Sequence, residues 1–165
     1  MVSKKKLNIS SNELNTIKPI TDNQKEVFAS YEKGQNLFLY GVAGTGKTFV
    51  ALYNALKDVL DPKSPRERVY IVRSLLPTRD IGFLPGDEED KSYLYQVPYQ
   101  NMVRFMFQRG SDAEFDRLYT DLRNQGTVDF LSTSFLRGIT IDNGVIIVDE
   151  CQNLNFHELD TIMTR

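Results

Sequence analysis

The sequence predicts an α/β fold with a mostly parallel sheet. Short, continuously apolar runs of strand length alternate with amphipathic helical patterns, and one glycine-rich segment joins such a run directly to a helix. Hydrophobic residues make up 41% and charged residues 25% of 165, which is typical of one globular domain. Continuously apolar strands are typical of a sheet covered on both faces, so we expect a three-layer α/β/α arrangement.

Composition and charge limit the domain organisation, the partners and the compartment that we expect for the chain. Residues 1–18 are polar and are expected to form a flexible lead-in to a single domain over residues 19–165. The net charge of −2 gives the whole chain no basic footprint for nucleic acid. The single cysteine, Cys151, excludes an internal disulfide and fits a reducing compartment. No signal peptide or membrane span is recognised, so we expect a cytoplasmic protein without membrane contact.

Helix and strand patterns then follow one another along the domain. Thr21 and Gln24 form a capping pattern that begins a helix, and Gly34 ends it. From Lys47 an amphipathic pattern predicts a helix to about Leu60. The other predicted elements are strands at 36–40, 68–73, 127–131 and 144–148, a loop at 75–90, helices at 91–108 (broken near Pro98) and 112–124, and a last helix from Asn155.

The glycine-rich segment matches the pattern G-x-x-x-x-G-K-[ST]. Glycines let the backbone curl so that several N–H groups face one anion, and the following helix adds the positive end of its dipole. Lys47 is expected to reach the β- and γ-phosphates of ATP as a catalytic cation, and the Thr48 hydroxyl to supply a Mg²⁺ ligand. The predicted nucleotide-binding residues are Gly41, Val42, Ala43, Gly44, Thr45, Gly46, Lys47 and Thr48, with Gln24 as a further candidate.

Two acids follow the apolar run at 144–148. Ligands bind at the carboxyl ends of parallel strands, so Asp149 and Glu150 are expected across the phosphate site. Asp149 is predicted to hold Mg²⁺ through its water shell, and Glu150 to orient or deprotonate the attacking water. The glutamate favours ATP hydrolysis over phosphate transfer to a small substrate, for which no arginine-bearing lid is found.

Four further polar residues have two interpretations each. Gln24 reads the adenine edge or closes the helix cap, and the two roles are compatible. Gln152 senses the γ-phosphate or couples to nucleic acid, or it is a polar residue at a helix start. Arg73 and Arg137 contact phosphate, or they form structural ion pairs.

Several segments occur in the order seen in PhoH-like proteins, the phosphate-starvation-inducible P-loop ATPases, which the chain resembles over residues 17–165. Gly82-Phe-Leu-Pro-Gly-Asp87 is the most specific segment, because a generic P-loop protein has no reason to carry it. The segments are Gly41–Thr48, Ile81–Asp87, the turn Arg137-Gly138-Ile139-Thr140, Asp149-Glu150-Cys151-Gln152-Asn153, and Met163-Thr164-Arg165, which is similar to the family's Leu-Thr-Arg.

The resemblance implies a RecA-like core similar to the first core of superfamily 1 helicases. It also implies ATP and Mg²⁺ as ligands, RNA or DNA as a partner, and a homo-oligomeric ring; a phage member would work in the host cytoplasm. Cys151 replaces a usual alanine, Ser74 replaces a proline, and residues 132–135 differ from the usual Pro-Leu-Ala-Tyr, which affects the nucleic-acid-facing loops more than the ATP site.

The family's Gly-Asp-x-x-Gln sensor strand is not found in this sequence, so we expect the C-terminal strands of the domain to be missing. This leaves an alternative to a working ATPase. The chain would then be a nucleotide-binding module that needs oligomerisation or further C-terminal elements for turnover.

Overall fold

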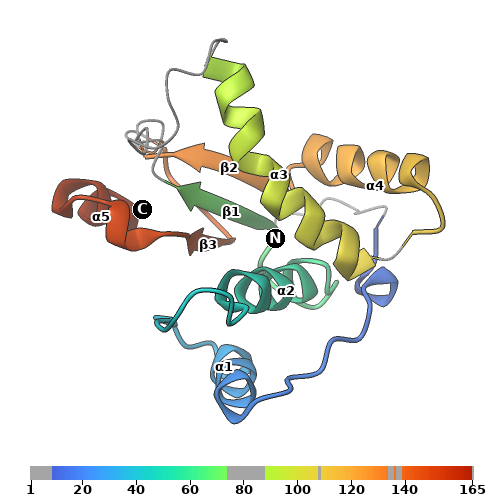
Figure 1. Cartoon of the computed structure of the whole chain (residues 1–165), viewed down its shortest axis with the longest axis horizontal. Helices are drawn as coiled ribbons and strands as arrows, with labels where there is room; N and C mark the ends of the chain where they lie inside the picture. Colours follow the sequence, from blue (N-terminus) through green and yellow to red (C-terminus); the bar gives the residue numbers. More distant parts are fainter. Residues whose placement is uncertain (1–8, 74–87, 108, 134–135, 137–138, 165) are drawn as a thin grey trace.

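A parallel sheet forms the centre of the molecule (Figure 1). The computed structural model describes residues 9–73, 88–107, 109–133, 136 and 139–164, with the backbone course alone for 88–94. Three strands pair in the order β2-β1-β3. They are β1 (Arg68–Arg73), β2 (Val128–Ser132) and β3 (Gly144–Val148). In register, Val72 lies beside Leu131 on one side and Val148 on the other.

Helices connect and cover these strands. The described helices are α1 (Asp22–Glu32), α2 (Lys47–Val59), α3 (Glu88–Phe107), α4 (Asp112–Asn124) and α5 (Phe156–Met163), with short 3-10 turns η1 (Ser11–Glu13) and η2 (Cys151–Asn153). Thr21, Ser111 and Asn155 cap α1, α4 and α5 by accepting a backbone N–H of the first turn. Within the described residues, no helix combines the length and apolar character needed to cross a bilayer.

Alternate strand residues divide the core into two apolar clusters. Val69 and Ile71 of β1 face a cluster that includes side chains of α2, α3 and α4. Val72 faces a second cluster with Leu136 and with Ile162 of α5. Because both faces of the sheet bury apolar side chains, the α/β class with a parallel sheet is confirmed.

The predicted strand at 36–40 is wrong. Residues 35–40 have no regular secondary structure, and Phe38 and Tyr40 are 77% and 86% exposed. An apolar run becomes a strand only where a neighbouring strand offers a hydrogen-bond ladder. The described sheet consists of β2, β1 and β3, so residues 36–40 pair with no described strand.

The predicted break near Pro98 is also wrong, since α3 runs unbroken from Glu88 to Phe107. Residues 88–90, at the end of the predicted 75–90 loop, belong to this helix instead. The rest of the predicted loop, 75–87, lies outside the described residues. A proline removes one N–H and bends a helix rather than always ending it. Three buried side chains beyond the proline, Tyr99, Val103 and Met106, hold the second half of α3 on the core.

The described part of the expected lead-in, residues 9–18, contacts the core. Ile9 is buried, and Leu14 and Ile17 pack against the main cluster. Asn15 bonds α3 twice, through its backbone N–H to Met106 and its side-chain amide to Phe105. Apolar residues spaced among the polar ones therefore attach this segment to the core.

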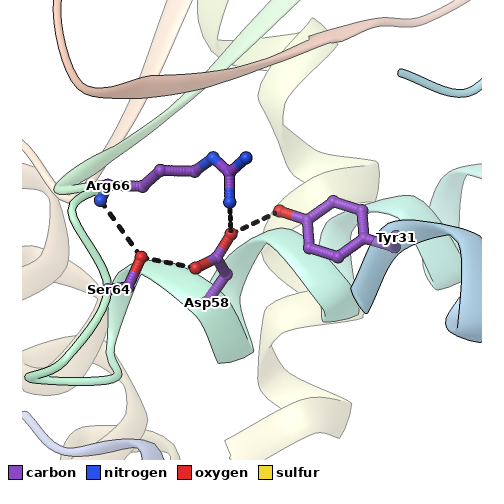
Figure 2. A network of polar contacts seen from close by, with 4 residues as sticks. All are labelled: Tyr31, Asp58, Ser64 and Arg66. Atoms are coloured by element: carbon purple, nitrogen blue, oxygen red, sulfur yellow. Dashed lines mark hydrogen bonds and ion pairs between the residues drawn. The ribbon is translucent and has the colours of Figure 1, made fainter. Parts of the chain in front are cut away.

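A polar network joins α1 to α2 and to the turn that follows α2 (Figure 2). The Asp58 carboxylate accepts hydrogen bonds from the Tyr31 hydroxyl at 3.0 Å, the Ser64 hydroxyl, and Arg66 Nη1 at 2.7 Å. The Asp58 side chain is 15% exposed. A half-buried carboxylate matched by a guanidinium and two hydroxyls is a structural connection between elements.

Candidate functional site

The backbone of the glycine-rich loop leads into α2 through left-handed conformations. Gly44 and Gly46 have φ of +77° and +81°, which glycine adopts without a steric cost. Gly46 is the N-cap of α2, and no side chain caps this helix end. The free N–H groups and the helix dipole therefore make this terminus suitable for an anion.

The Lys47 side chain folds back into the loop. Its ammonium donates to the carbonyl oxygens of Gly41 at 3.0 Å and Val42 at 2.8 Å. The Thr45 hydroxyl donates to the same Val42 carbonyl at 3.0 Å. Residues 41–45 are exposed while Lys47 is half-buried, so a positive charge lies at the base of an open loop.

The glycine-rich loop and the acidic pair after β3 lie far apart in the sequence and meet in the structure. Thr48 Oγ1 donates to Asp149 Oδ1 at 2.9 Å, across 101 residues of sequence. The Asp149 N–H donates to the carbonyl of Val72 at 3.0 Å, which extends the β1–β3 ladder one residue past β3. The carboxyl end of β3 thus places Asp149 at the start of α2, as the sequence predicts.

A third side chain in this cluster was missed by the sequence reasoning. The Tyr99 hydroxyl, from α3, donates to Asp149 Oδ2 at 2.6 Å. Burial raises the pKa of Tyr99 far above its usual range, and the bond to Asp149 adds to the rise, while Arg73 opposes it. A buried tyrosine needs a hydrogen-bond partner, but no local pattern says which one, so sequence gave no signal for this contact.

Glu150 leaves the strand in an unusual backbone conformation. Its φ is +51°, in the left-handed region where a glutamate is rarely found. The side chain is exposed, and its carboxylate accepts a hydrogen bond from Gln152 Nε2. The structure thus pairs Glu150 with Gln152, and no described contact joins Glu150 to the glycine-rich loop.

The remaining candidates have separate outcomes. Gln24 Oε1 accepts from the N–H of Ile20 at 2.9 Å rather than from the cap residue, and Gln24 Nε2 lies 4.0 Å from where a β-carbon on Gly46 would stand. Gln24 is therefore at the loop. Arg73 lies over the Tyr95 ring at 5.7 Å and beside the Tyr99 hydroxyl, and it forms no ion pair with any described residue. Arg137 lies outside the described residues.

Hard oxygen donors dominate the junction of the two motifs. The Thr48 hydroxyl gives its proton to Asp149, so its lone pairs remain for a cation, and the carboxylate adds negative charge. Hydroxyl, carboxylate and phosphate oxygens are the ligands that Mg²⁺ prefers. No group of three or more His, Cys, Asp or Glu side chains suited to a metal occurs in the part of the chain described. The donor set therefore fits an ion held jointly with a bound phosphate.

Comparison with known proteins gives a consistent result. The family model described as PhoH-like protein matches residues 16–165. Protein PhoH2 of Bacillus subtilis is 34% identical over 128 residues, which are 77% of this chain and 28% of that protein. A PhoH-like protein of Synechocystis sp. is 30% identical over 147 residues, covering 88% of this chain and 42% of that protein.

A third relative has the same range of similarity. Protein PhoH of Escherichia coli (strain K12) is 30% identical over 143 residues, which are 86% of this chain and 38% of that protein. The chain thus spans less than half the length of each of these relatives. With a family model that covers most of its residues and a matching phosphate loop, the chain belongs to the PhoH-like proteins, a family of P-loop nucleoside triphosphatases.

Proposed function

We propose that this chain binds ATP with Mg²⁺ in the 41–48 loop and hydrolyses it. The contact of Thr48 with Asp149 carries the proposal, because it joins the end of the phosphate loop to the acidic end of β3. The uncapped N-terminus of α2 and the Lys47 ammonium supply positive charge beside it. A triphosphate is the anion that suits such a loop.

Thr48 and Asp149 would hold the magnesium ion, Asp149 through a water of its shell. When bound, the ion would neutralise charge on the β- and γ-phosphate oxygens. Lys47 would exchange its bonds to the loop carbonyls for bonds to these same oxygens. Its positive charge then stabilises the negative charge that develops as the bond to the γ-phosphorus breaks.

Glu150 is proposed as the residue that activates water. Its carboxylate accepts a proton as the water oxygen attacks the γ-phosphorus, and the β–γ bridging oxygen departs with ADP. Gln152 already bonds this carboxylate, so it is suited to orient Glu150 or to report on the γ-phosphate. Gln24 lies beside Gly46, and we propose that its amide contacts the adenine edge.

Coupling of hydrolysis to RNA or DNA in a homo-oligomer is part of this proposal. It rests on the family membership, and the chain spans only part of its relatives. A second candidate function is nucleotide binding without turnover by this chain alone. The Glu150 side chain is exposed and bonded to Gln152 rather than to the loop, which favours binding without turnover.

Glu150→Gln tests the hydrolysis. The variant keeps the shape and the left-handed backbone of the residue but cannot accept a proton. We expect ATP affinity within about twofold of wild type and a kcat lower by about 10²–10⁴. Equilibrium binding of a fluorescent ATP analogue and phosphate release measure the two quantities.

Glu32→Gln is a matched control, because it makes the same change at an exposed glutamate whose ion-pair partner is Lys57, and its turnover should equal that of wild type. Turnover of Glu150→Gln equal to wild type would remove Glu150 from the mechanism. Turnover per chain that rises with protein concentration would indicate that a second copy contributes catalytic groups. Turnover that rises with added polynucleotide would indicate that nucleic acid activates the site. A chain that binds ATP but never turns it over would support the binding module instead.

A further inference from the structure

We infer that Tyr99 is a positioning residue for Asp149, holding one carboxylate oxygen so that the other faces Thr48. The inference rests on the proposed Mg²⁺·ATP site and adds a residue to it. Tyr99 lies on α3, outside both sequence motifs of the site.

Asp149 is bonded at both carboxylate oxygens by hydroxyl groups. Oδ1 accepts from Thr48 at 2.9 Å and Oδ2 from Tyr99 at 2.6 Å. The second distance is in the range of charge-assisted O–H···O⁻ bonds, which are stronger than neutral ones. With Oδ2 held in this way, rotation of the carboxylate about its Cβ–Cγ bond costs the energy of this hydrogen bond.

The position of the Tyr99 hydroxyl is fixed by the packing of its ring. Tyr99 is 2% exposed and belongs to the main core cluster, and its ring centroid lies 5.4 Å from that of Phe130 on β2. A side chain locked in the core holds its polar end to a small tolerance. The hydroxyl therefore supports Asp149 from the core side, as outer partners of metal ligands commonly do.

The donor type matters as much as the position. A hydroxyl orients a carboxylate without cancelling its charge, whereas a lysine or arginine in the same place would neutralise it. Among the described residues no cation forms an ion pair with Asp149, although Arg73 lies beside the Tyr99 hydroxyl. The hydroxyl groups therefore orient the carboxylate, and its charge has no ion-pair partner within the described residues.

Tyr99→Phe removes only this hydroxyl and leaves the ring. We expect the Mg²⁺ concentration for half-maximal binding of a fluorescent ATP analogue to rise by about 10- to 100-fold. Binding of the analogue without Mg²⁺ should not change. Tyr31→Phe is the matched control, because it also deletes a tyrosine hydroxyl that donates to an aspartate, and its Mg²⁺ dependence should equal that of wild type.

A double-mutant cycle separates positioning from general packing. In an Asp149→Asn background, Tyr99→Phe should cause no further change in Mg²⁺ dependence, since Tyr99 acts through the carboxylate. An additive effect, or an unchanged Mg²⁺ dependence of Tyr99→Phe beside a wild type that binds ATP, would overturn the inference and leave the proposed function intact. A wild type that binds no nucleotide would overturn both.

A second measurement needs no variant and covers the case in which Tyr99→Phe does not fold. In a crystal structure of the wild-type chain with Mg²⁺ and a non-hydrolysable ATP analogue, the Tyr99 hydroxyl should stay within hydrogen-bond distance of Asp149. A carboxylate turned away from Tyr99 in that complex would contradict the positioning role.

Discussion

Asp58 and Asp149 are two half-buried carboxylates with similar hydroxyl partners and different counter-charges. Each accepts one bond from a tyrosine and one from a serine or threonine hydroxyl. Asp58 also has Arg66 at 2.7 Å (Figure 2), whereas no described cation pairs with Asp149. The Asp58 carboxylate has its counter-charge within the fold, whereas the Asp149 carboxylate has no ion-pair partner among the described residues. A carboxylate that the fold orients but does not neutralise is a candidate ligand for an external cation.

Among the variants that test this comparison of Asp58 with Asp149, Asp149→Asn should have the largest effect. The amide keeps a polar group for Thr48 and Tyr99 but loses the charge that a magnesium ion needs. We expect kcat/KM for ATP to fall by about 10²–10³, in the range that removal of one key electrostatic group causes. The midpoint of thermal unfolding should shift by only a few degrees. A large loss of stability with unchanged ATP turnover would make Asp149 a structural residue like Asp58.

Asp58→Asn should have the opposite profile. It leaves Arg66 without its counter-charge and weakens two hydroxyl bonds, so the free energy of unfolding should fall by about 1–3 kcal/mol in urea titrations. The partial exposure of Arg66 keeps the loss in that range. ATP binding at a temperature where the variant is folded should match wild type.

Glu32→Gln is a control for that variant. The Glu32–Lys57 ion pair also links α1 to α2, at 3.5 Å, but both side chains are more than half exposed. An exposed pair contributes about 0.5 kcal/mol or less. If Asp58→Asn and Glu32→Gln lowered the free energy of unfolding equally, the Asp58 network would have no special structural role.

The effect confined to the narrowest range of conditions is a pH dependence at Tyr31. Burial raises the pKa of Tyr31 above its ordinary range, the charge and hydrogen bond of Asp58 add to the rise, and Arg66 opposes it. The folded chain therefore keeps this proton at a pH where the unfolded chain, with a tyrosine pKa of about 10, loses it. The stabilisation is complete below about pH 10 and is lost as the pH rises further. Unfolding free energies across that range should fall less steeply in Tyr31→Phe than in wild type, and parallel curves would contradict the assignment.

The sequence predicted the local parts of the site better than its long-range parts. The loop 41–48 and the acids after β3 were recognisable because each is a contiguous pattern, and parallel strand ends converge, which placed Thr48 by Asp149. The run 36–40 failed as a strand because hydrophobicity does not say which neighbour offers a ladder. Tyr99 could not be found because its contact depends on how α3 packs on the sheet, and that packing has no signature in the residues around it.

The left-handed backbone at position 150 favours some amino acids over others. Asn143 and Glu150 share a φ of +51°, yet asparagine adopts this conformation readily and glutamate does not. The cost of a left-handed glutamate is about 1 kcal/mol, which glycine or asparagine would largely avoid. The backbone conformation alone would therefore favour glycine or asparagine at position 150, and the presence of a glutamate there agrees with the role proposed for its carboxylate.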